Sequence, residues 1–162
     1  MELIRELIDD LPTLSQLGHA TVRMLTAALL GGLIGLQREF VGTAAGLRTH
    51  MLVSLGSAFF VIVAVDIGMP VADLSRVIQG VATGIGFIGA GTILKLSREH
   101  EIRGLTTAAS LWVTAALGVA VGLGRIGIAV AGTVLTWIVL AVFGYLSHRI
   151  GPRRPHDTES DV

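Results

Sequence analysis

Three glycines in the stretch GIGFIGAG, residues 84–91, have the spacing of the motif that binds the pyrophosphate of a dinucleotide. Such a site needs a strand before the glycines, a helix after them, and an acidic residue roughly 20 positions further on. The nearest acids, Glu99 and Glu101, lie only 10 and 12 residues after Gly89. The flanking segments VIQGVAT and TILKL continue one largely apolar stretch. A nucleotide site is therefore disfavoured, and these glycines need another explanation.

No other arrangement of residues predicts catalysis or metal binding. The chain has no cysteine, which excludes a thiolate nucleophile and a Cys-based zinc site. Its histidines are scattered at loops and at the ends of apolar stretches: His19, His50, His100, His148 and His156. No carboxylate lies at the middle of an apolar stretch, although Mg²⁺ is usually held through carboxylates and retained waters. We expect no enzyme and no bound metal or cofactor.

The composition is that of a membrane protein. Hydrophobic residues make up 52% of the 162 residues and charged residues only 15%, and the mean hydropathy is +0.74, well above the soluble range. Twelve basic and twelve acidic residues balance, so no global positive field would attract nucleic acid. We expect a protein of the lipid bilayer that does not bind nucleic acid.

Five apolar stretches approach the length that crosses a bilayer, about 20 residues. They run from Ala20 to Leu36, from Thr49 to Val65, from Val77 to Leu94, from Gly104 to Gly124 and from Ile126 to Ser147. The sequence predicts an all-α, polytopic protein with five transmembrane helices over residues 20–148. Residues 1–19, acidic with apolar residues at helical spacing, are predicted to form an interfacial segment. The polar residues 149–162 are predicted to be a disordered tail.

The distribution of Lys and Arg predicts the orientation. Three segments that would share one side carry eight basic residues: Arg38, Arg48, Lys95, Arg98, Arg103, Arg149, Arg153 and Arg154. The opposite side carries three: Arg5, Arg76 and Arg125. By the positive-inside rule the N-terminus lies outside and the C-terminus in the cytoplasm. The single Arg125 between the last two spans also predicts a very tight turn there.

Small residues spaced four apart suggest close helix packing, because helices in lipid associate where small side chains let their backbones approach. The spacing occurs at Gly31 and Gly35, at Gly80, Gly84, Gly86 and Ala90, and at Gly118 and Gly122. An alternative explains the density of glycine in the third span differently. Each glycine weakens a helix, so this span could be broken around a polar cavity. Close helix packing is the favoured hypothesis, and a broken third span is the alternative.

Charged residues near the ends of the spans suggest two pairings. Arg23 and Asp66 could form an ion pair near the outer surface, although separate extension of each to the interface is slightly favoured. On the inner side Glu39 can neutralise Arg38 or Arg48 and leave the other arginine for a lipid phosphate or a partner.

A faint internal repeat is also present. The segments GLRTHMLVSLGSA from Gly46 and GLTTAASLWVTAA from Gly104 both follow a basic loop and begin a span. The chain could therefore consist of two parallel helix hairpins and a fifth helix. Few positions match, so chance similarity is an equal alternative.

Three motifs together resemble the MgtC/SapB family of bacterial inner-membrane proteins. They are GGLIGLQREFVGTAAGLRTHMLVSLGSA, DLSRVIQGVATGIGFIGAGTIL and RGLTTAASLWVTAALGVAVGLG, in family order over residues 31–124. The family signature corresponds to Gly35, Arg38, Glu39, Ala45, Gly46, Leu47, Arg48, Thr49 and His50, then to Arg76, Gln79, Gly80, Gly84, Gly86, Phe87, Gly89, Ala90 and Gly91, and then to Gly104, Leu105, Thr106, Thr107, Ala108, Ala109, Trp112, Ala115 and Gly118. Many members similar to MgtC continue into a soluble cytoplasmic domain, so this chain resembles a short form.

The resemblance implies a protein linked to magnesium limitation and, in pathogens, to virulence. Family members are thought to regulate other membrane machines, such as the ATP synthase or a cation ATPase, and do not themselves carry magnesium. The first functional hypothesis is a non-enzymatic regulator that binds partner helices or a second copy of itself. The alternative is a small transporter or channel for magnesium or another ion.

Overall fold

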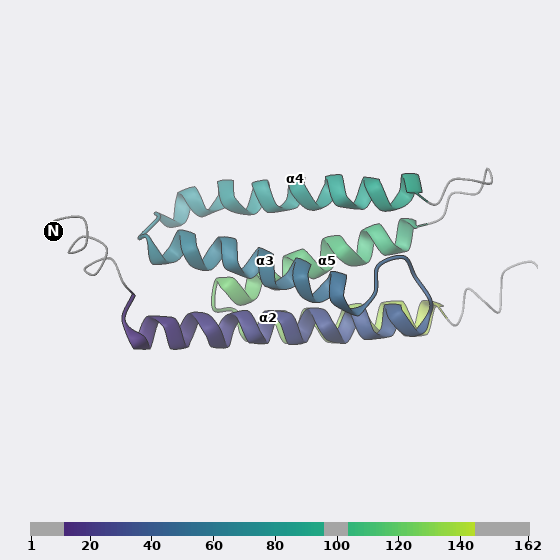
Figure 1. Cartoon of the computed structure of the whole chain (residues 1–162), viewed down its shortest axis with the longest axis horizontal. Coiled ribbons are helices and arrows are strands. Elements are labelled where there is room, and N and C mark those ends of the chain that lie inside the picture. Colours follow the sequence, from purple (N-terminus) through teal and green to yellow (C-terminus); the bar gives the residue numbers. More distant parts are fainter. Residues whose placement is uncertain (1–11, 96–103, 145–162) are drawn as a thin grey trace, which may run out of the picture.

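The computed structural model describes residues 12–95 and 104–144, and every regular element within these residues is helical. Figure 1 shows the helices lying side by side as a bundle. They are α2 (Leu14–Phe40), α3 (Leu47–Asp66), α4 (Val71–Lys95), α5 (Leu105–Gly122) and α6 (Ile126–Ile138), which continues into a π-helical segment, η1 (Val139–Phe143). The all-α prediction is confirmed.

Helices α2 to α5 are long and apolar enough to cross a membrane, whereas α6 is apolar but shorter. The first helix begins at Leu14, six residues before the predicted Ala20, because Thr13 and Gln16 form a reciprocal capping box at its start. Residues 14–19 therefore belong to α2 and extend the first span. Residues 1–11 and the predicted tail, 149–162, lie outside the described residues, and the side of the membrane on which each end lies stays a prediction.

Helix α4 is continuous through the glycine-rich stretch. A single α-helix covers Val71–Lys95 and includes Gly84, Gly86, Gly89 and Gly91. The alternative of a broken third span is therefore wrong for this structure. Five glycines in 25 residues are tolerated because the backbone groups bond within the helix, as a lipid environment requires.

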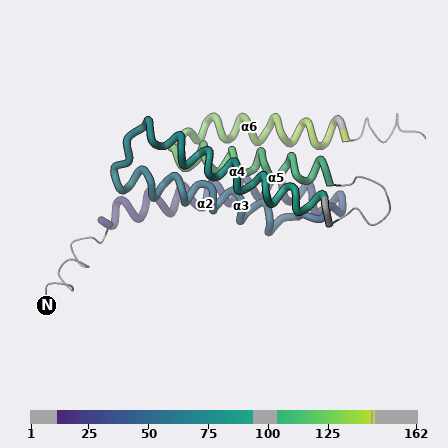
Figure 2. Tube along the Cα trace, turned by 90° about the horizontal axis from the view of Figure 1, so that it is seen from above, coloured from purple at the N-terminus to yellow at the C-terminus, as the bar shows by residue number. Residues whose placement is uncertain are grey.

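Helix α5 occupies the centre of the bundle. It contacts α2, α3, α4 and α6, and its apolar residues are far more buried within the bundle than those of α4. Figure 2 shows α5 between α6 and α3. The turn from α5 to α6 is as tight as predicted, because Gly124 takes a φ of 76° that favours glycine.

The two segments of the suggested repeat occupy corresponding places. Gly46 and Gly104 are the N-cap residues of α3 and α5. Both helices start at the same end of the bundle and run in the same direction (Figure 1). This arrangement agrees with two parallel hairpins, α2–α3 and α4–α5, followed by α6.

Candidate functional site

Glycines of α2 and α5 lie directly against the backbone of α3. A Cβ atom added at Gly31 would lie 2.6 Å from the carbonyl oxygen of His50, and one at Gly122 would lie 2.8 Å from the carbonyl oxygen of Ala58. Gly35 and Gly118 are equally close to α3, at Leu47 and Ser54. The packing prediction is confirmed for these positions, since no larger residue fits without moving a helix.

The glycines of α4 are mostly free of such contacts. An added Cβ would meet nothing within 4 Å at Gly80, Gly84, Gly86 or Gly91. Gly89 alone among the α4 glycines packs on a neighbour, with Ala108 of α5 at 3.3 Å. Within this chain the packing prediction is therefore wrong for Gly80, Gly84 and Gly86. The α4 backbone is bare there because α3 diverges from it.

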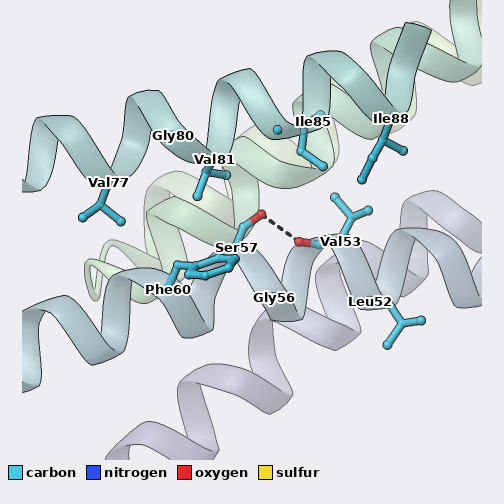
Figure 3. Close-up of a pocket in the computed structure, with 11 residues that line it drawn as sticks. Leu52, Val53, Gly56, Ser57, Phe60, Val77, Gly80, Val81, Ile85 and Ile88 are labelled. Carbon is cyan, nitrogen blue, oxygen red and sulfur yellow. Dashed lines mark hydrogen bonds between the residues drawn. The ribbon is translucent and has the colours of Figure 1, made fainter. Parts of the chain in front are cut away.

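The divergence leaves an apolar groove between α3 and α4, which we call the α3/α4 groove. Its volume is about 630 Å³. Figure 3 shows side chains from both helices pointing into it. The lining consists of Leu52, Val53, Gly56, Ser57, Phe60, Val77, Gly80, Val81, Gly84, Ile85 and Ile88. The one hydroxyl, that of Ser57, donates to the carbonyl oxygen of Val53 at 2.8 Å, so the groove offers almost no free polar group.

At one end of the bundle, the turn between α2 and α3 is closed by a carboxylate. Oε2 of Glu39 accepts a hydrogen bond from the backbone N–H of Leu47 at 2.7 Å. Glu39 thereby caps the first turn of α3, where a negative charge is favourable. Gly46 lies against this carboxylate and leaves no room for a Cβ. The predicted neutralisation of Arg38 or Arg48 by Glu39 is not formed.

Arg38 lies on the inner face of α2 at this same end. Its side chain is only 6% exposed, and its Nε has no hydrogen-bond partner. Across the described ranges no carboxylate lies within 4 Å of its guanidinium. The C-terminal dipole of α2 stabilises the charge by about 0.3–1 kcal/mol, whereas burial of an unpaired ion costs several kcal/mol. Within the described part of the chain, the charge has no further compensation.

His50 links α3 to α5 beside Arg38. Its ring is fully buried, and Nδ1 donates to the carbonyl oxygen of Gly46 at 2.9 Å. Nε2 lies 3.1 Å from Oγ of Ser110, whose hydroxyl also lies 2.8 Å from the carbonyl oxygen of Thr107. When the ring is neutral, Nε2 accepts, so the Ser110 hydroxyl has two competing acceptors.

At the opposite end of the bundle, the ion pair between Arg23 and Asp66, the less favoured of the two alternatives, is not formed. Nη1 of Arg23 donates instead to the carbonyl oxygen of Gly122 at 3.2 Å. Arg23 thus satisfies one of the free carbonyls at the C-terminus of α5. Arg76 makes an exposed i,i+3 contact with Asp73 at 3.9 Å, and Gln79 beyond it is also exposed.

The structure therefore separates the predicted site residues into four places. Arg38, Glu39, Gly46, Arg48 and Thr49 lie at the same end of the bundle as Gly104, Thr106 and Thr107, where α3 and α5 begin. Arg76 and Gln79 lie on the first turns of α4, near the other end. Trp112 is 53% exposed on α5. The glycines of α4 lie between the two ends.

The contact between His50 and Ser110 is the feature that the sequence did not single out. His50 is one of the scattered histidines and also part of the family signature, and the Ser110 hydroxyl lies in the first turns of its span, where hydroxyls can bond across helices. The available signal was the parallel alignment of the two repeat segments, which places both near the first turns of neighbouring helices. Within residues 12–95 and 104–144, no group of three or more His, Asp or Glu could hold a metal ion.

Sequence comparison identifies the family. The profile of the MgtC family matches residues 24–149. The chain belongs to the MgtC family. With four helices able to span a bilayer, this MgtC-family chain is a multi-pass membrane protein.

Three relatives illustrate the similarity. The YhiD protein of Escherichia coli (strain K12) is 43% identical over 142 residues, 83% of this chain and 65% of that protein. The SrpB protein of Synechococcus elongatus is 44% identical over 132 residues, 75% of this chain and 72% of that protein. The MgtC protein of Brucella abortus is 43% identical over 126 residues, 78% of this chain and 52% of that protein. The matched region of this MgtC-family chain thus spans between half and three-quarters of these relatives. No solved structure matches the chain.

Proposed function

We propose that this protein is a non-enzymatic regulator in the bacterial inner membrane that binds a helix of another membrane protein. Through this contact it serves adaptation to low magnesium and, where the bacterium is a pathogen, virulence. The observation that carries this proposal is the α3/α4 groove, in which the backbone of α4 is bare at Gly80 and Gly84.

The groove suits a transmembrane helix. It follows α4 over the 12 residues from Val77 to Ile88, about 17 Å between the first and last Cα at the rise of an α-helix. Association in lipid depends on close backbone approach, which glycines four residues apart allow. Gly31 and Gly35 use the same spacing for contact with α3 within the chain. The occupant that fits is a partner helix with small residues on its facing side.

The connection to magnesium rests on the relatives. The family takes its name from MgtC, and the YhiD relative is described as a candidate magnesium transporter. Partner complexes consistent with the proposal are the ATP synthase and a cation ATPase, whose membrane sectors supply helices.

Magnesium transport by the chain itself is the second candidate, favoured by the description of YhiD. A transport path for this cation needs oxygen ligands, most often carboxylates. The described part of the chain brings no three acidic or histidine side chains together, and the groove is lined by apolar side chains. These features favour regulation.

The test compares Gly84→Leu with Gly86→Leu in cells that lack the native protein. Both glycines are on α4 with open space around them, but only Gly84 lines the groove. We expect Gly84→Leu to abolish growth in limiting magnesium and crosslinking of α4 to its partner, with normal membrane insertion. Gly86→Leu should retain both.

A flux measurement separates the two candidates. Purified protein in liposomes should give no magnesium flux above that of empty liposomes. Saturable flux that Gln79→Ala or Asp66→Asn removes would overturn the regulatory proposal and support transport.

A further inference from the structure

Arg38 is the strongest unexplained feature of the molecule. The residue is only 6% exposed, its Nε has no hydrogen-bond partner, and the carboxylate of the neighbouring Glu39 accepts a hydrogen bond from the N–H of Leu47. A buried charge is retained in proteins when it is paired or hydrogen-bonded. Among residues 12–95 and 104–144, no anion fills this role for Arg38.

Other positive features surround this charge. Arg38 follows Gly31 and Ile34 along the buried face of α2, at spacings of seven and four residues. His50 of α3 contacts Ser110 in the first turns of α5. Helices α3 and α5 both begin at this end (Figure 1), so the positive ends of two helix dipoles add to the guanidinium.

Only one of these two helix starts is neutralised within the described residues. Glu39 caps α3, whereas the N-cap residue of α5 is Gly104, with a φ of 92° and no side chain to accept a hydrogen bond. The backbone N–H groups of a helix start bind oxyanions readily, and the planar guanidinium pairs with two oxygens of one phosphate. A phosphate group satisfies both requirements, whereas a monatomic anion does not.

We propose that Arg38, together with the start of α5, forms a binding site for a phosphate group, supplied by the headgroup of an anionic lipid. The end of a spanning helix lies at the depth of the lipid phosphates, so the bilayer offers this ligand at high local concentration. Lipid occupancy would fix the ends of α2, α3 and α5 relative to one another. The site lies at the bundle end and is separate from the α3/α4 groove.

The test uses the full chain in nanodiscs of phosphatidylcholine, with or without phosphatidylglycerol. Thermal unfolding and native mass spectrometry are measured for the wild type, Arg38→Met, Arg38→Lys and the control Arg48→Met, which removes an exposed arginine of the same bundle end. We expect phosphatidylglycerol to raise the unfolding temperature of the wild type and of Arg48→Met by roughly 5 °C, as a saturating ligand does.

Arg38→Met should show no such rise and no retained phosphatidylglycerol, and Arg38→Lys should show a smaller rise. In phosphatidylcholine alone, Arg38→Met should unfold at the wild-type temperature or above it, because the unpaired charge is gone. An arginine with a purely structural role would instead make Arg38→Met less stable in both lipids, which would overturn the proposal.

Inorganic phosphate added to the phosphatidylcholine nanodiscs distinguishes the source. An equal rise with free phosphate would support the site and assign it to a soluble anion. No rise with either ligand would overturn the proposal. The acids Glu99 and Glu101 lie outside the described residues, and their double change to Gln provides a further check. If that change destabilised the protein as Arg38→Met does and lipid had no effect, an internal carboxylate would be the counter-ion and the proposal would fail.

Discussion

The same sequence feature, glycines four residues apart, has opposite consequences in two regions of this protein. In α2 and α5 the glycines lie against the backbone of α3, at Gly31, Gly35, Gly118 and Gly122. In α4 the glycines Gly80 and Gly84 face open space. The comparison teaches that small residues permit close approach but do not specify the helix that approaches. In α4 no helix among the described residues makes that approach at Gly80 or Gly84.

The largest effect is expected where a glycine is packed against α3. Gly118→Ala would bring a methyl group against the carbonyl oxygen of Ser54, and the backbone there cannot move without shifting α3. We expect the free energy of unfolding to fall by about 2–3 kcal/mol, measured by denaturant titration in detergent micelles. Gly127→Ala, at an exposed position of α6 with nothing within 4 Å, is the control. Equal stability of the two variants would contradict the tight α3–α5 contact.

An intermediate effect on stability is expected at Gly46, where the carboxylate of Glu39 caps the start of α3. Gly46→Ala would displace the carboxylate of Glu39 from the N–H of Leu47. The loss of this cap should cost about 1 kcal/mol, observed as a lower unfolding temperature. Glu39→Ala should cost a similar amount and Glu39→Gln, which keeps an acceptor oxygen, less. The costs of Gly46→Ala and Glu39→Ala should not add in the double variant; full additivity would show that the two residues act separately.

The smallest effect on the free energy of unfolding, with the opposite sign, is expected at an α4 glycine that faces open space. Gly86→Ala adds a methyl group where nothing lies within 4 Å, so only the helix preference of alanine over glycine remains. We expect a gain of about 0.5–1 kcal/mol in the same detergent titration. A loss of stability would mean that Gly86 contacts another part of the protein. Gly84→Ala in the isolated chain should give a similar gain, and Gly89→Ala, which faces Ala108, a smaller one.

Much of the fold follows from the sequence because length and hydropathy limit what a chain can do in lipid. The charge-free stretch from Gly104 to Gly124 predicted α5 within a few residues, and the lone Arg125 predicted the turn that follows. The start of α2 was placed six residues too late, because hydropathy does not register a capping box such as that of Thr13 and Gln16.

The candidate site was less predictable, since charge pairing depends on side-chain direction. Sequence proximity suggested that Glu39 neutralises an arginine, yet the carboxylate caps α3. Likewise Arg23 donates a hydrogen bond to a carbonyl oxygen at the end of α5 and does not pair with Asp66. Backbone groups at helix ends compete with charged side chains as partners, and that competition is not visible in residue spacing.

The sequence alone determined that this chain is an all-helical membrane protein of the MgtC family, because apolar length and a glycine-rich signature are properties of the chain itself. Only the tertiary structure decided which glycines are closed by α3, that α4 is unbroken with a bare face, and that Arg38 is buried with no counter-charge among the residues that the structure describes. Those facts depend on which helices come together and how closely, and the free energy of such contacts is set by the partner surface as much as by the residue.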